Sequence, residues 1–214
     1  NEISARIAYL FNYGFEKLVQ REELIMKLDG DIILPSNYCG TIVSEFEKNT
    51  RLGIASGCAI YQNKKEKNFD ETLTRGAAKY YLTKCFEQIG KAYISRGWDT
   101  VDNYAAQLYG WETKKLDIYF DHKKEEGKKS GLIMLRYWTG LYSGRIPYYF
   151  PYFVLKNIYF LFAKPFLIGS FIELIGYFNA RFFKKESPFP KNVCNYVIQI
   201  QKHKIINSLT MNKM

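Results

Sequence analysis

The chain has 214 residues, of which 47% are hydrophobic and 24% are charged, and this composition excludes a wholly disordered protein. The length suffices for one domain, or for one domain with a helical appendage. The four cysteines are scattered, with no CxxC pair and no zinc-finger spacing, so they indicate a reduced, intracellular protein.

The net charge of +10 is distributed unevenly along the chain. Residues 1–122 carry 16 Lys and Arg against 17 Asp and Glu, a net charge of −1, whereas residues 123–214 carry 15 against 4, a net charge of +11. A basic half of this kind is typical of proteins that meet nucleic acid or an anionic lipid surface. Because it is rich in Tyr, Phe, Leu and Ile and has no recognisable nucleic-acid-binding motif, we expect no nucleic-acid partner.

The spacing of apolar residues and the turn signals predict alternating helices and strands in the first 122 residues. In chain order they predict a helix over 4–19, a buried strand over 24–28, a helix after 35–37, a buried strand over 52–61, a polar loop over 62–71, helices over 76–89 and 99–109, and a strand over 116–122. This alternation favours an α/β layer architecture.

After Gly131 the composition changes, and residues 132–142 and 147–183 are crowded with aromatic and aliphatic side chains. Lysines and arginines interrupt them, so neither stretch offers the roughly 18 uninterrupted apolar residues that a membrane-spanning helix needs. They predict amphipathic helices lying in a membrane interface, with a helical subdomain packed on the α/β part as the alternative. We therefore expect two parts, residues 1–127 and residues 128–214.

The strand predicted over 24–28 ends at Asp29-Gly30-Asp31. A carboxylate pair at a strand end is a natural site for Mg²⁺ or Mn²⁺, which take oxygen ligands and keep positions open for phosphate oxygens. Two acids separated by one residue also allow one side chain to bind the metal while the other contacts a sugar or ribose hydroxyl.

The stretch KLDGDIILPSNY, residues 27–38, resembles the DxD segment of family-2 glycosyltransferases of the GT-A fold. Further similarity lies in the spacing to Phe46 and 52–57, in an acceptor-side block at 75–77, 89–90 and 97–102, and in Ala105, Gly110 and His122. The resemblance covers about residues 1–185. It implies a GT-A-like, Rossmann-like mixed sheet followed by amphipathic C-terminal helices.

The resemblance also implies roles for the residues at the motif positions. Asp31 is the second acid of the DxD motif and a metal ligand, and Asp29, beside Gly30, contacts the donor and the metal site. His122 completes the site for Mn²⁺ or Mg²⁺, with a purely structural histidine as the alternative. Arg75 and Gly76 belong to the block that binds donor and acceptor.

Asp99 matches the general base of inverting members, which takes the proton from an acceptor hydroxyl as that hydroxyl attacks the anomeric carbon. The metal meanwhile stabilises the departing diphosphate. The family commonly has Glu-Asp where this chain has Trp98-Asp99. Trp98 either packs against a sugar ring of the acceptor or belongs to the core. Asp102, one helical turn further, is the fallback base or a helix-start acid without a catalytic part.

Members of the family begin with a strand-helix-strand unit that binds the nucleotide base, but only 28 residues precede Asp29 here. The expected fold therefore lacks the first nucleotide-binding strands, and we expect the 214 residues to be part of a longer enzyme. That enzyme transfers a sugar from a nucleotide-diphosphate donor to a polysaccharide, glycan or lipid-linked acceptor at the inner face of the cytoplasmic membrane. The alternative is a non-catalytic, membrane-associated interaction module that cannot bind the donor.

Overall fold

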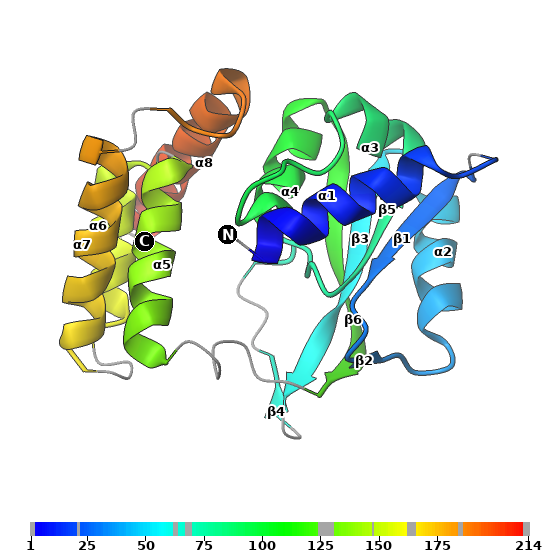
Figure 1. Ribbon diagram of the computed structural model, residues 1–214, viewed down its shortest axis with the longest axis horizontal. Coiled ribbons are helices and arrows are strands. Elements are labelled where there is room, and N and C mark those ends of the chain that lie inside the picture. The colour runs from blue at the N-terminus through cyan, green and yellow to red at the C-terminus, as the bar shows by residue number, and fades with distance from the viewer. Residues whose placement is uncertain are drawn as a thin grey trace. The chain divides into compact units, whose positions relative to one another are not determined.

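The computed structural model divides the chain into two compact units, Asn1–Glu125 and Glu126–Met214 (Figure 1). It describes residues 3–20, 22–61, 64–66, 70–123, 131–146, 148–161, 166–183 and 186–211. The four cysteines are free, and only Cys39 among them is exposed.

The first unit contains a mixed, open β-sheet with the strand order β1-β5-β3-β6-β2. Strands β3 and β6 run parallel, whereas the other neighbours pair antiparallel, and β4 pairs with the end of β3. This is an α/β architecture compatible with a Rossmann-like fold, so the expected fold class is confirmed at that level. The strands are β1 (Leu24–Leu28), β2 (Ile32–Ile33), β3 (Leu52–Tyr61), β4 (Lys64–Lys65), β5 (Ala78–Leu82) and β6 (Glu112–His122).

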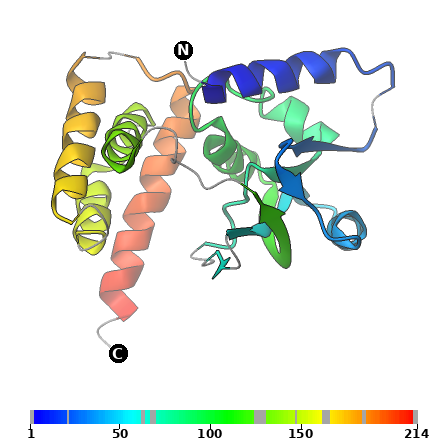
Figure 2. The same ribbon diagram turned by 60° about the horizontal axis from the view of Figure 1, so that its bottom comes forward.

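Helices cover both faces of this sheet (Figure 2). Buried residues of α2 (Tyr38–Lys48) form a core with the side chains of β3, β5 and β6 that point to that face. On the other face, Phe11 of α1 packs against Tyr81 and Phe86, with ring centroids 5.9 and 5.1 Å away. The helices on that face are α1 (Ile3–Glu16), α3 (Thr83–Gln88) and α4 (Trp98–Leu108).

Most of the elements predicted for the first unit are confirmed, but the helix predicted over 76–89 is wrong. Residues 78–82 form β5, which lies in the sheet between β1 and β3, and only residues 83–88 are helical. Tyr80 and Tyr81 favour a strand because aromatic side chains pack well on a pleated surface. Lys79, which directly precedes them, is fully buried, and its charge interrupts the apolar pattern expected of a buried strand. The loop predicted over 62–71 also contains the two-residue strand β4.

The second unit is helical, with α5 (Leu132–Arg145), α6 (Phe150–Tyr159), α7 (Ile168–Phe183) and α8 (Lys191–Met211). Among the described residues, no helix combines the length and the apolar character needed to cross a membrane. Helix α5 does not separate apolar from polar faces in the way expected of an amphipathic helix, because its buried side is made of Gly140, Leu141, Ser143 and Gly144.

Helices α5 and α7 touch through their glycines. A side chain at Gly140 would collide with the carbonyl oxygen of Glu173, and one at Gly144 would lie 2.6 Å from the carbonyl oxygen of Tyr177. Small residues four positions apart allow two helix backbones to approach this closely. Glu173, only 2% exposed at this contact, is paired with Arg136 at 3.2 Å and with Lys156 at 3.6 Å.

We expect Gly140→Ala to destabilise the second unit by about 1–3 kcal/mol, because an added methyl group forces the two helix backbones apart. Urea unfolding followed by circular dichroism measures the change. Gly14→Ala in α1 is the matched control, since nothing lies within 4 Å of a side chain added there, and it should stabilise the protein by up to about 1 kcal/mol. Equal effects of the two variants would contradict the close packing of α5 and α7.

Candidate functional site

Asp29 lies directly after β1 and is held by the segment that precedes β5. Its amide donates to the carbonyl of Ala77 at 2.8 Å, and its Oδ1 accepts from Lys27 Nζ at 2.7 Å. The same ammonium group donates to the carbonyl of Gly76 at 2.7 Å. Lys27 therefore neutralises one carboxylate oxygen of Asp29. Gly30 lies in an open turn, with no atom within 4 Å of a side chain added there.

Asp31 and His122 meet because β2 and β6 pair with Ile32 opposite His122. The Oδ1 of Asp31 lies 3.6 Å from Nε2 of His122, whose side chain is 10% exposed. The other ring nitrogen, Nδ1, lies 3.0 Å from the hydroxyl of Tyr61 at the end of β3. A hydrogen bond at one ring nitrogen fixes the orientation of the ring and determines which nitrogen is left to bind a ligand. Tyr61 thus orients Nε2 toward the acid.

Within the ranges that the structure describes, no three His, Cys, Asp or Glu side chains lie close enough together to hold a metal ion. Asp31 and His122 form a pair, while Asp29 faces Lys27. Two protein ligands fit a divalent cation that fills its remaining positions with water and substrate phosphates, as Mg²⁺ does in many phosphate-binding enzymes. The residues present therefore fit a cation shared with a diphosphate, and the three-ligand set of Asp29, Asp31 and His122 stays a prediction.

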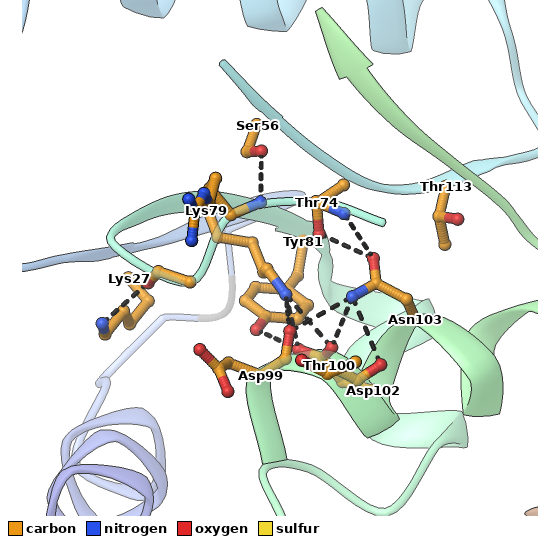
Figure 3. A network of polar contacts seen from close by, with 12 residues as sticks. Lys27, Ser56, Thr74, Lys79, Tyr81, Asp99, Thr100, Asp102, Asn103 and Thr113 are labelled. Carbon is orange, nitrogen blue, oxygen red and sulfur yellow. Dashed lines mark hydrogen bonds and ion pairs between the residues drawn. The ribbon is translucent and has the colours of Figure 1, made fainter. Parts of the chain in front are cut away.

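Asp99 lies in the first turn of α4, where the helix dipole favours a carboxylate. Its carbonyl accepts from Lys79 Nζ at 2.6 Å, whereas its carboxylate accepts no hydrogen bond from the described residues and points away from the polar network (Figure 3). A side chain added at Gly76 would lie 2.8 Å from the Asp99 Cβ, so only glycine fits against this acid. The backbone and Cβ of Asp99 are thus held in place, while its carboxylate makes no hydrogen bond with a described residue.

Asp102, by contrast, is fully engaged in the buried network of Figure 3. Both of its oxygens lie 3.1 Å from Lys79 Nζ, and Oδ2 accepts from the Tyr81 hydroxyl at 2.6 Å. Asn103 Nδ2 donates to Oδ1 at 3.0 Å. Burial raises the pKa of Asp102, while the charge of Lys79 and the hydrogen bond from Tyr81 oppose that shift. With 1% of its surface exposed, Asp102 has no access to an acceptor, so of the two acids predicted as a base only Asp99 keeps its carboxylate outside the buried network.

The segment carrying Arg75 and Gly76 is held from two sides. The side-chain oxygen of Asn103 accepts from the amide and the hydroxyl of Thr74, at 3.1 and 2.6 Å, and Ser56 Oγ accepts from the Arg75 amide at 2.7 Å. The Arg75 side chain, 32% exposed, donates from Nε to Glu66 at 2.7 Å. Arg75 therefore lies beside Gly76 with its guanidinium group partly open to solvent.

Trp98 belongs to the core. It is 2% exposed, its ring centroid lies 6.2 Å from that of Phe11, and Lys27 Nζ lies 5.9 Å from the indole. No face of the indole is open to a sugar, so the structure supports the core interpretation over acceptor binding.

Three residues of the site were not predicted from the sequence: Lys27, Tyr61 and Lys79. The two lysines carried a signal, because a lysine inside a buried strand requires an anionic or polar partner nearby. Tyr61 carried none, since it ends a strand without any motif around it.

A hollow of about 730 Å³ lies at the other end of β1 and contains none of the predicted site residues. Its lining includes Glu22, Glu23, Glu47, Glu87 and Trp111. The polar residues described above are therefore not gathered in this hollow.

A comparison of the chain with protein-family models and with curated proteins finds no match. The fold and the site define an α/β protein with an open mixed sheet and an Asp–His pair at the end of two strands.

We expect Asp102→Asn to destabilise the protein by about 3–5 kcal/mol, because it leaves the buried ammonium group of Lys79 without a counter-charge. Asp99→Asn should change the stability by no more than about 0.5 kcal/mol, since its carboxylate makes no hydrogen bond to a described residue. Denaturant unfolding of both variants measures the difference. A large loss of stability in Asp99→Asn would contradict the distinction between the two acids.

The lowered pKa of Glu66 predicts that the free energy of unfolding depends measurably on pH. Burial alone would raise the pKa of Glu66, but Arg75, the amide of Ala59 and Lys115 outweigh it and lower the pKa. A carboxylate with a lowered pKa in the folded state adds stability above its unfolded pKa and loses that contribution as the pH falls. The stability difference between wild type and Glu66→Gln should therefore be largest near neutral pH and should shrink below pH 4.5, the ordinary glutamate value. A difference that does not change with pH would contradict this origin.

Proposed function

We propose that the first unit is the cation-binding and acceptor-binding part of an inverting, metal-dependent glycosyltransferase of the GT-A type. The observation that supports this most strongly is the Asp31–His122 pair, which two strand ends bring to 3.6 Å. Asp31 lies two residues from Asp29, which is paired with Lys27. Lys27 also donates to the carbonyl of Gly76, and Gly76 lies against Asp99. The turn at Gly30 and the loop that carries Gly76 thus connect the predicted cation ligands to the predicted base.

In this proposal Asp31 and His122 hold Mn²⁺ or Mg²⁺ together with the diphosphate of a nucleotide-sugar donor. The bound cation supplies positive charge to the leaving diphosphate. Asp29 keeps one oxygen on Lys27 and offers the other to a hydroxyl of the donor sugar or ribose. Arg75, partly exposed beside Gly76, adds a cationic group at the same loop.

Asp99 acts as the general base on the acceptor. Its carboxylate takes the proton from an acceptor hydroxyl while that oxygen attacks the anomeric carbon from the face opposite the leaving diphosphate, which inverts the configuration. Lys79 and Gly76 keep the acid in place by contacts to its carbonyl and to its Cβ, so that they position the carboxylate without binding it.

The second unit holds the enzyme at the inner face of the cytoplasmic membrane, where it meets a lipid-linked, glycan or polysaccharide acceptor. The positive charge of this unit supports the membrane location, because residues 131–214 carry 11 Lys and Arg against 2 Asp and Glu. Each cation near an anionic leaflet contributes on the order of 1 kcal/mol to binding. A non-catalytic module that binds the membrane without binding a donor is the second candidate, and the same charge supports it.

The test is thermal unfolding with Mn²⁺ and a panel of nucleoside diphosphates, beginning with UDP. We expect Tm to rise only when both are present, because the cation shares its ligands with the diphosphate, and saturation at about 100 times Kd corresponds to ~2.7 kcal/mol. Asp31→Ala and His122→Ala should abolish the rise. Asp99→Asn should keep it and lose sugar transfer.

Asp121→Ala is the matched control, since it removes an acid from the same strand at a position whose side chain points to the opposite face. It should keep the nucleotide-dependent rise in Tm. A protein that binds membranes but whose Tm no nucleotide changes, with or without Mn²⁺, is the non-catalytic module.

A further inference from the structure

Helix α7 presents a stripe of large apolar side chains to solvent. Phe171, Ile175, Phe178 and Phe182 are 64%, 43%, 40% and 71% exposed. They recur every three or four residues, so they share one face of the helix and extend along about 16 Å of its length. Surface stripes of this size on a soluble protein mark a contact with another molecule or with a membrane.

One end of this stripe is hollowed into a depression of about 350 Å³, lined by Phe150, Tyr177, Phe178, Arg181 and Phe182. Phe150 comes from α6, and its ring centroid lies 5.8 Å from that of Tyr177 and 5.7 Å from that of Phe178. Tyr177 forms a fixed floor, because it is buried and its hydroxyl donates to the carbonyl of Tyr148 at 2.8 Å. The depression is therefore an aromatic slot with a buried tyrosine as its floor.

Arg181 stands in the lining of this slot without a counter-charge. It is exposed and makes no hydrogen bond or ion pair with any described residue. The two acids of residues 131–214 do not compensate it, since Glu173 is buried between Arg136 and Lys156 and Glu186 forms no ion pair with a described residue. An arginine of this kind favours a phosphate, which its planar guanidinium binds through two hydrogen bonds.

An anionic amphiphile satisfies both features at once. A second copy that docks through the same unit would oppose 11 Lys and Arg to 11 Lys and Arg, with only 2 Asp and Glu on each side, and a neutral apolar peptide would leave Arg181 without an anion. A phospholipid would place its phosphate on Arg181 and its acyl chains over the rings of Phe150, Phe178 and Phe182, which line the depression. The rest of the stripe, Phe171 and Ile175, then continues into the same apolar layer.

We infer that the α6–α7 slot is a phospholipid-binding site and that the exposed stripe of α7 is the face that enters an anionic leaflet. This inference rests on the membrane location proposed above and specifies the face and the lipid.

The experiment measures partition of the full chain onto vesicles of phosphatidylcholine mixed with phosphatidylglycerol, by sedimentation, without nucleotide or Mn²⁺. Arg181→Gln should weaken partition about five-fold, the equivalent of ~1 kcal/mol for one cation at the surface. The double variant Phe178→Ser, Phe182→Ser should weaken it by roughly ten-fold or more, because each ring loses apolar contact with the lipid. Both variants should keep the helical circular dichroism of the wild type, since the substituted side chains are exposed.

Matched controls lie on α8. Lys204→Gln removes one positive charge, as Arg181→Gln does, and Ile206→Ser removes an exposed apolar side chain that is 55% accessible. Both should leave partition close to that of the wild type. Equal losses for Lys204→Gln and Arg181→Gln would overturn the slot as a phosphate site, because bulk charge alone would then account for binding.

Two further outcomes would overturn the inference. One is partition of the Phe178→Ser, Phe182→Ser variant equal to that of the wild type, and the other is self-association of the wild type that this variant abolishes. The second outcome would assign the stripe to a second copy of the chain. Failure of the transferase proposal appears in a different measurement, the nucleotide-dependent Tm, and leaves the vesicle result in place.

Discussion

The buried ion pair between Lys79 and Asp102 is the interaction on which the first unit depends. Lys79 extends from β5, which lies between β1 and β3 in the sheet, and Asp102 extends from α4, and both are almost completely removed from water. Burying two charges is costly, and here Tyr81, Asn103 and the carbonyl of Asp99 offset that cost with hydrogen bonds to the pair. The pair fixes the start of α4 over the sheet. Through Asn103 it also fixes Thr74, and with it the loop that carries Arg75 and Gly76.

Much of the fold of the first unit was predictable because its strands and helices carry local signals. The apolar runs at 24–28 and 52–61 and the helix start after residue 37 are patterns within a single segment. Strand β5 was missed because the charge of Lys79 is compensated by Asp102, which lies 23 residues further along the chain. A compensation of that kind is a property of the folded structure and leaves no local pattern in the sequence.

The candidate site also contains some residues that local patterns predict and some contacts that only the folded structure determines. The carboxylate pair at 29–31 and the acid at 99 were found from their local patterns and from a family resemblance. The Asp31–His122 distance depends on the register between β2 and β6, which no single segment determines. The ion pair between Asp29 and Lys27 was likewise not predicted from the sequence. Because of this pair, a donor hydroxyl or a cation has to compete with an ammonium group for the Asp29 carboxylate. Lys27 is therefore as much a part of the site as the acids.

The close packing of α5 and α7 has a consequence for the membrane location proposed for the second unit. Contact between water-soluble helices usually depends on excluding water from large apolar side chains, a driving force that disappears when the surroundings are themselves apolar. Here the contact is made by backbone atoms at Gly140, Gly144 and Gly176, and by the ion pairs of Glu173. Dispersion forces between backbones and an enclosed ion pair persist in hydrocarbon as they do in water. The contact between α5 and α7 would therefore keep its geometry in water and in an apolar environment alike.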